Sequence, residues 1–249
     1  MSNTLTLAKI TALSALVAMA RFANAGTELD YLEKPLANRV VKLPVLPGFL
    51  PACEEDPQFA QRAALMSPKN TLFLTCLVDS RKWRDFRDGR SINLYPFVAV
   101  TVALPHPSGD FTPDDFQNLK AATRAQLGNL LADNQYAKRQ IAAQDKKLSK
   151  VGTEVHRRDY QEGLQGFFEP IGGNSSFSYV VSRSATVSEG GVTRGVREMN
   201  AVSTILYSGR LLLLNVVDQP SDSAQGLTVQ EITSRWLHAF RRFNEASEK

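Results

Sequence analysis

The chain has 249 residues, of which 43% are hydrophobic and 22% charged, and its formal net charge at neutral pH is +4. That length suits one large domain. The near balance of 29 basic and 25 acidic residues argues against a nucleic-acid partner. After the N-terminal region no stretch approaches the roughly 18 consecutive apolar residues of a membrane span. We therefore expect no transmembrane span in the mature chain.

The first 25 residues show the three-part pattern of a secretory signal. Lys9 gives a positive start, Ile10–Ala20 is a short apolar run, and small residues end the segment. We expect cleavage between Ala25 and Gly26, which predicts a periplasmic or secreted location. The alternative is an apolar N-terminal helix of the folded domain.

The chain has two cysteines, Cys53 and Cys76. An even number of cysteines in an exported chain predicts a disulfide bond, because the compartment is oxidising. The chain-entropy argument gives such a bond a value of about 3 kcal/mol. The alternative is a pair of separate buried thiols, since Cys76 lies inside the apolar run TLFLTCLV.

In the first half of the chain, a polar lead-in (26–39) precedes a single domain that starts at residue 40. Proline and glycine after Leu43 limit the first element to a short edge strand. Asp56 precedes a stretch of helical composition, and two apolar, β-branched runs follow it. The predicted elements are a strand over Val40–Leu43, a helix over Asp56–Met66, and strands over Thr71–Val78 and Tyr95–Leu104.

In the second half, Thr112 and Pro113 start a helix, and its apolar spacing continues to Asp133. The basic segment 133–150 either continues this helix or forms a second, largely exposed one. Residues 151–176 are rich in glycine and are expected to be irregular. The remaining predicted elements are a strand over Phe177–Val187, a hairpin of Val196–Tyr207 and Arg210–Val217 around Ser208-Gly209, and a final helix that starts at the capping box Thr228–Glu231.

This order predicts an α+β fold with a mainly antiparallel sheet and helices packed on its faces. The stretches QGFFEPIGGNSSFSYVVSR and YSGRLLLLNVVD, followed by a helix with Trp236, resemble uncharacterised exported bacterial proteins with a Mog1/PsbP-like α/β sandwich. The resemblance covers roughly residues 40–245 in element order, and matching local motifs occur in the last third alone. It implies an accessory, chaperone or assembly role, and it carries no catalytic residue to this chain.

Motifs for catalysis and for cofactor binding are missing from the sequence. Gly172–Ser176 does not have the spacing of a nucleophile elbow, and Gly190–Gly195 does not have the form of a phosphate-binding loop. The three histidines, His106, His156 and His238, are far apart and lie in no metal-ligand motif. We therefore expect no cofactor and no metal site.

The segment DSRKWRDFRDGR, residues 79–90, places several arginines around two aromatic residues in the connection between two predicted strands. Arginine forks bind carboxylates and phosphates, and exposed aromatic rings add contact area. One interpretation is a contact patch for an anionic partner or lipid headgroup, formed by Arg81, Lys82, Trp83, Arg84, Phe86, Arg87 and Arg90. The other is a solvated turn in which three aspartates neutralise the charge and the two aromatic residues pack inward.

A second segment of interest is the glycine-rich stretch with Leu164, Phe167 and Phe168. Its adjacent aromatic rings either line a ligand cleft or pack into the core. From these observations we expect a non-enzymatic periplasmic binding or accessory protein whose partner is an unknown protein or anionic ligand. The competing hypothesis is an exported hydrolase with a dispersed active site, in which a histidine meets a carboxylate in a pocket.

Overall fold

The computed structural model describes residues 30–36, 39–68, 70–91, 93–104, 109–150, 155–171, 174–189, 192–219 and 228–245. Internal contacts divide the chain into Met1–Asp30 and Tyr31–Lys249, and the fold is that of the second unit. The expected signal segment, with its cleavage point between Ala25 and Gly26, lies outside the described residues, and so does His106.

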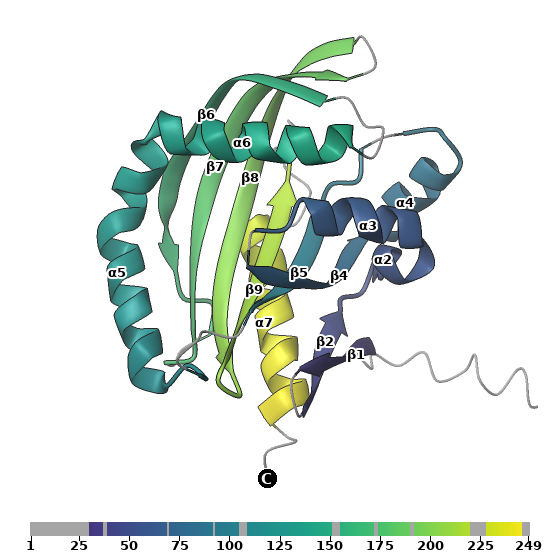
Figure 1. Ribbon diagram of the computed structural model, residues 1–249. Coiled ribbons are helices and arrows are strands. Elements are labelled where there is room, and N and C mark those ends of the chain that lie inside the picture. Colours follow the sequence, from purple (N-terminus) through teal and green to yellow (C-terminus); the bar gives the residue numbers. More distant parts are fainter. Residues whose placement is uncertain are drawn as a thin grey trace, which may run out of the picture. The chain divides into compact units, whose positions relative to one another are not determined.

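The described residues form nine strands and six helices (Figure 1). The strands are β1 (Asp30–Leu36), β2 (Arg39–Val45), β3 (Phe49–Leu50), β4 (Thr71–Asp79), β5 (Phe97–Ala103), β6 (Val155–Phe168), β7 (Ser176–Glu189), β8 (Val192–Tyr207) and β9 (Arg210–Asp218). The helices are α2 (Ala52–Glu55), α3 (Pro57–Leu65), α4 (Ser80–Arg87), α5 (Pro113–Ala132), α6 (Asn134–Ser149) and α7 (Val229–Glu245).

Seven of the strands form one antiparallel sheet in the order β3-β4-β5-β9-β8-β7-β6, and β1 pairs with β2 in a separate two-stranded sheet. Helices cover both faces of the large sheet, so the fold is α+β, as the sequence predicts. The disulfide segment and the connection of residues 79–90 both lie at the β4 end of this sheet.

The main core lies between the sheet and α7. Leu212, Leu214 and Val216 alternate along β9 and are completely buried or nearly so. The apolar stripe of α7 contacts β8 and β9 and includes the buried Ile232 and Trp236. The fourth position of β9 among seven strands explains its near-continuous apolar sequence, because both faces of a central strand are covered.

The β8–β9 hairpin turns at Ser208 and Gly209, as predicted. Both residues have positive φ, 49° and 74°, which is the backbone of the two-residue turn that matches strand twist. A Cβ on Gly209 would lie 2.6 Å from the Cβ of Asp110, so the close approach of that residue also requires glycine here.

The face of the sheet opposite α7 carries the other helices. Figure 1 shows α5 and α6 toward the β6 end of this face and α2, α3 and α4 toward the β4 end. Phe116 of α5 packs against Phe177 of β7, with ring centroids 5.6 Å apart. Cys76 pairs with Ala99, and Ala99 pairs with Asn215 of β9. Because directly paired residues share a face, Cys76 faces away from α7.

The structure differs from the sequence prediction at three places and decides between the alternatives left open at a fourth. Part of the polar lead-in forms β1, and the stretch expected to be irregular contains β6, an edge strand of 14 residues. The predicted turn of residues 79–90 contains the helix α4. The segment 112–150, for which one or two helices were expected, forms two helices that meet at Asp133.

The sequence does not predict β6, because the pairing of this strand with β7 is irregular. Its register with β7 shifts between Arg158 and Gln161 and again between Leu164 and Gly166. Such bulges break the alternation of apolar and polar residues on which a sequence-based strand assignment depends. Asp159 and Gly166 both have positive φ at these points.

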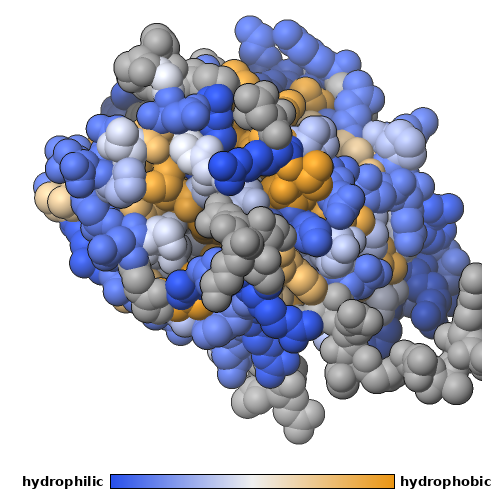
Figure 2. Space-filling model, turned by 90° about the horizontal axis from the view of Figure 1, so that it is seen from below, coloured by the Kyte–Doolittle hydropathy of each residue, from blue (hydrophilic) through white to orange (hydrophobic). Residues whose placement is uncertain are grey.

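Apolar side chains also reach the surface. Figure 2 shows several hydrophobic areas on one face, separated by hydrophilic residues. Among the described residues, the half-exposed large apolar side chains include Leu72, Leu104 and Leu130.

Candidate functional site

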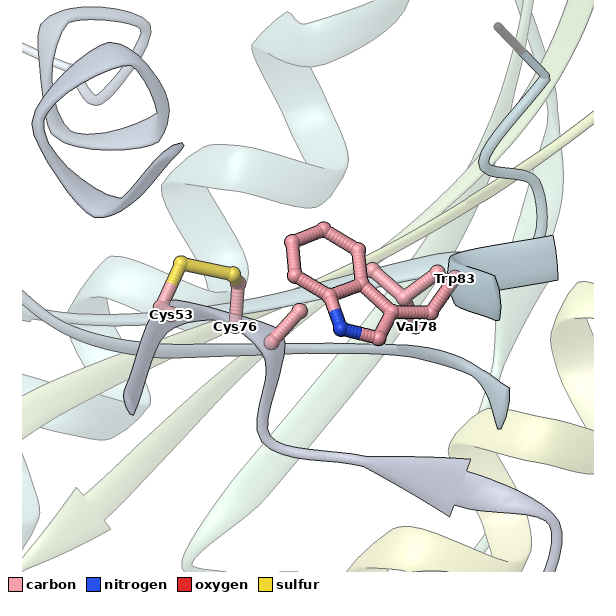
Figure 3. Close-up of a cluster of buried hydrophobic side chains, with 5 residues drawn as sticks. Cys53, Cys76, Val78 and Trp83 are labelled. Carbon is pink, nitrogen blue, oxygen red and sulfur yellow. A yellow bond between two sulfur atoms is a disulfide. The ribbon is translucent and has the colours of Figure 1, made fainter. Parts of the chain in front are cut away.

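A disulfide bond fixes the segment that carries the candidate site. Cys53 of α2 is bonded to Cys76 of β4, with their Cα atoms 5.3 Å apart, which confirms the predicted pairing. The bond lies in a buried cluster with Ala52, Val78 and Trp83 (Figure 3). It therefore holds α2 against the strand that leads directly into α4.

The helix α4 begins where β4 ends, because Asp79 caps it. The Asp79 carboxylate accepts hydrogen bonds from the backbone N–H groups of Arg81 and Lys82, at 2.9 and 3.2 Å. This is the usual role of aspartate at a helix N-cap. The backbone N–H of Ser80 also donates to the carbonyl of Gly48 at 2.9 Å, which ties the start of α4 to the turn before β3.

The two aromatic residues of α4 pack inward. Trp83 is 3% exposed, and its ring stacks on Phe86 with centroids 5.4 Å apart. Phe59 of α3 contacts both rings. Of the two interpretations of this segment, the inward packing of the aromatic residues holds at Trp83. The i, i+3 spacing of Trp83 and Phe86, together with a capping aspartate, is the sequence signal that predicts a helix here.

The indole N–H of Trp83 is satisfied by a residue that the sequence analysis did not select. Trp83 Nε1 donates to Glu55 Oε2 at 2.8 Å, and Glu55 lies two residues from the disulfide. The sequence predicts a helix over Asp56–Met66 and assigns Glu55 no role beyond the acidic start of that helix. In the structure, Asp56 caps α3, whereas Glu55 belongs to the short helix α2 and anchors Trp83.

A pocket of about 350 Å³ opens beside Trp83. The pocket is lined by Leu50, Glu55, Ser80, Trp83, Arg84 and Arg87. It is at the small end of the range for ligand pockets, so it suits a side chain or a small chemical group rather than a large cofactor. The pocket is built by three segments, β3, α2 and α4. The pairing of Leu50 with Val78 of β4 brings β3 next to the strand that leads into α4.

Arg84 and Arg87 outnumber the single carboxylate of the pocket, Glu55, which accepts the Trp83 indole N–H. Both arginines are exposed. Within the described residues, neither guanidinium lies at salt-bridge distance from a carboxylate. Arg87 lies over the Trp83 ring, with its Cζ 6.0 Å from the centroid, which is the geometry of a cation–π contact. A guanidinium group without an ion-pair partner can donate two parallel hydrogen bonds to a carboxylate or phosphate group.

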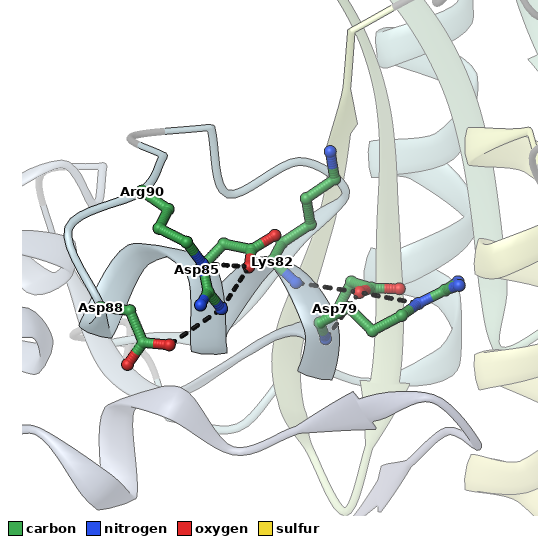
Figure 4. Close-up of polar contacts among 6 residues, drawn as sticks. Asp79, Lys82, Asp85, Asp88 and Arg90 are labelled. Carbon is green, nitrogen blue, oxygen red and sulfur yellow. Dashed lines mark hydrogen bonds and ion pairs between the residues drawn. The ribbon is translucent and has the colours of Figure 1, made fainter.

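The other charged residues of the predicted patch point to different partners (Figure 4). Arg90 binds Asp85 and Asp88, at 2.8 Å from each, and these carboxylates raise its pKa above the ordinary value. Arg81 is 86% exposed at its side chain and lies 3.9 Å from Asp79. Of the seven predicted patch residues, Trp83, Arg84 and Arg87 line the pocket, and Phe86 packs against the buried cluster that contains Trp83.

A second polar cluster lies under α6, on the face opposite α7. In the strand register, Arg183 of β7 lies opposite Glu162 of β6 on one side and Glu198 of β8 on the other. Its Nε donates a hydrogen bond to Glu162 at 2.7 Å. Tyr95 donates to Glu198. Burial is the largest cause that raises the pKa of Tyr95 far above its ordinary value, and the negative charge of Glu198 is the second. The phenol therefore stays protonated and acts as a hydrogen-bond donor. These contacts hold the segment before β5 against β8.

The remaining candidates are dispersed. Phe167 lies in the edge strand β6, 6.0 Å from the Tyr179 ring by centroid, and Arg124 lies over its face. His156 and His238 are both exposed, and His238 Nδ1 lies 2.7 Å from the carbonyl oxygen of Ser234 in its own helix. In the part of the chain that the structure describes, no three His, Cys, Asp or Glu side chains form a group that could hold a metal ion.

Among the described residues, none of the helices has the length and apolar character that crossing a membrane requires. No protein-family model matches the sequence, and no curated protein matches it.

Solved structures of Mog1 are similar to the chain. The Ran-binding protein Mog1p of Saccharomyces cerevisiae is 12% identical, with a TM-score of 0.34, over 86% of this chain and 94% of that one. A point mutant of Mog1 is also 12% identical, with a TM-score of 0.35 and the same coverage. The Mog1 resemblance expected from the element order is thus found among solved structures. A likeness of this size carries no argument about function, which depends on the site itself.

Proposed function

We propose that the protein is a non-enzymatic, exported binding or accessory protein that holds an anionic group of a partner in the α4 pocket. The observation that carries the proposal is that Arg84 and Arg87 line an open pocket and have no carboxylate at salt-bridge distance among the described residues. A carboxylate is the anionic group that a protein partner carries most often, and it matches the fork geometry of arginine. We therefore infer an acidic segment of a protein partner.

The rigidity of the site supports a binding role. The disulfide, the Asp79 cap and the Trp83–Glu55 hydrogen bond fix the three segments that line the pocket. A preorganised site loses little conformational entropy when it binds, so a small contact can still be specific. Leu50 and Trp83, which also line the pocket, add apolar contact area beside the charge.

Export is the second part of the proposal. The signal-like segment of residues 1–25 is its main support, and the disulfide agrees with it, because disulfides persist in oxidising compartments. The competing hydrolase hypothesis expects a histidine and a carboxylate together in a pocket. The lining of the α4 pocket includes no histidine, so this pocket does not support that hypothesis.

The test is affinity co-purification from an extract of the exporting compartment after mild crosslinking, with mass spectrometry of the bound proteins. The proposal expects a reproducible partner whose recovery falls at least tenfold in the variant Arg84→Ala/Arg87→Ala and declines with added salt. Arg81→Ala is the matched control, because Arg81 belongs to the same helix and is 86% exposed but does not line the pocket. Equal recovery with all three proteins would contradict the proposal.

A further inference from the structure

A separate feature of the molecule is the charge of α6 and of the strand that follows it. Residues 133–158 hold seven of the 29 basic residues and three of the 25 acidic ones. The rest of the chain therefore holds 22 of each sign, and the whole formal excess of +4 falls in this one segment. Such a concentration in one segment of an otherwise balanced chain creates a local positive potential.

The packing of α6 sorts its side chains. Ile141 and Leu148, one heptad apart, are buried against the body of the protein. Asp145 lies between them in sequence and pairs with Arg157 of β6, with Nη2 and Oδ1 3.0 Å apart. The acidic side chain Asp145 thus makes an internal contact, and the described charged side chains on the outer side of the helix are cations.

The outer side of α6 carries unpaired positive charge. Arg139, Lys146 and Lys150 follow one another at i, i+7 and i+11, which places them on one stripe about 16 Å long. All three are exposed, and so is Lys138. Within the described residues none of these four lies at salt-bridge distance from a carboxylate. Figure 1 shows α6 lying across one face of the sheet, over β6, β7 and β8, so its outer side is the side turned away from the sheet.

We propose that this stripe is a docking surface for a bilayer that contains anionic phospholipids. Three of the four cations are lysines, which act as compact point charges on flexible stems and need no fixed partner geometry. A linear row of such charges on the convex side of a helix matches a fluid, negatively charged headgroup surface. Leu130, 51% exposed in the last turn of α5, adds an apolar side chain three residues before the cap of α6.

The test is co-sedimentation of the protein, expressed as the full chain, with vesicles of 70% phosphatidylcholine and 30% phosphatidylglycerol. Vesicles of pure phosphatidylcholine give the baseline, which also absorbs any apolar contribution of the N-terminal segment. Each cation near such a surface contributes roughly a fivefold factor in affinity. We expect the variant Arg139→Gln/Lys146→Gln/Lys150→Gln to bind the anionic vesicles at least tenfold more weakly, and raised salt to abolish the difference.

The matched control removes the same charge elsewhere. Arg81→Gln/Arg235→Gln/Arg242→Gln changes three exposed arginines outside α6 and should retain the affinity of the unaltered protein. Glutamine favours helix nearly as well as lysine, and the circular dichroism melting curve of each variant verifies its folding.

Equal binding to both kinds of vesicle, or equal loss in both triple variants, would overturn the proposal. So would binding to an acidic polypeptide such as polyglutamate without binding to the anionic vesicles. Because no α4 pocket residue is changed, either result leaves the proposed partner pocket independently testable.

Discussion

At the scale of single residues, the hydrogen bond from Trp83 to Glu55 connects the disulfide segment with the candidate site. The change Glu55→Ala removes the acceptor of a buried indole N–H. An unsatisfied buried donor costs about 1–3 kcal/mol, so the free energy of unfolding should fall by that amount. Urea denaturation followed by circular dichroism measures it.

The control for this prediction is Glu33→Ala, which removes an exposed glutamate from β1. It should change the free energy of unfolding by less than about 0.5 kcal/mol, as surface substitutions usually do. If Glu55→Ala were equally mild, the indole would not depend on this acceptor.

Tyr160 makes a pH-dependent contribution to stability. Burial, its largest cause, raises the pKa of Tyr160 from 10.0 to about 12. Because the folded pKa lies above the unfolded one, this contribution is fully present below pH 10 and is lost as the pH rises through 12. The variant Tyr160→Phe should therefore lose less stability than the unaltered protein between pH 9 and pH 12 in urea melts. Parallel loss in the two proteins would show that Tyr160 does not contribute.

At the scale of elements, the disulfide has the largest single effect that we expect. Replacing Cys53 and Cys76 by alanine removes a crosslink with a sequence separation of 23 residues. The chain-entropy estimate for such a loop is about 3 kcal/mol, so the urea midpoint should fall markedly. Reduction of the unaltered protein should produce a similar shift, and no shift on reduction would contradict the structure.

The cap of α4 connects the fold with the proposed function. Asp79→Ala removes the acceptor of two backbone N–H groups and should cost about 1 kcal/mol. Because Arg84 and Arg87 lie on this helix, partner recovery should fall as well. Asp79→Asn keeps a capping oxygen and should retain most of the stability. Equal loss in both variants would assign the effect to the charge rather than to the cap.

The elements also show which sequence signals were sufficient. The β8–β9 hairpin, the stripe of α7 and the start of α5 were predicted because the turn and capping residues act locally. The edge strand β6 was not predicted, because its bulges break the alternation of side chains. The helix α4 was assigned to a turn, because its charged residues hid the i, i+3 aromatic pair that a capping aspartate precedes.

At the scale of the whole molecule, the sequence predicted the α+β class and the disulfide, but not the pocket. Arg84 and Arg87 were selected from the arginine-rich segment alone. Ser80 lies one turn before Arg84 in the same helix, whereas Leu50 and Glu55 join them only through the pairing of β3 with β4 and through the disulfide. Contacts of this kind connect distant parts of the chain, and local patterns contain no information about them.

The central claim is that the partner binds at the α4 pocket. The most direct test places a photo-crosslinking amino acid at Ser80, which lines the pocket, and compares it with the same group at Arg81, which is 86% exposed outside the pocket. Irradiation of cells that express each full chain, followed by mass spectrometry, identifies the adducts. We predict a discrete protein adduct from position 80 that disappears with Arg84→Ala/Arg87→Ala and is absent from position 81. No adduct from position 80, or the same adducts from both positions, would contradict the claim.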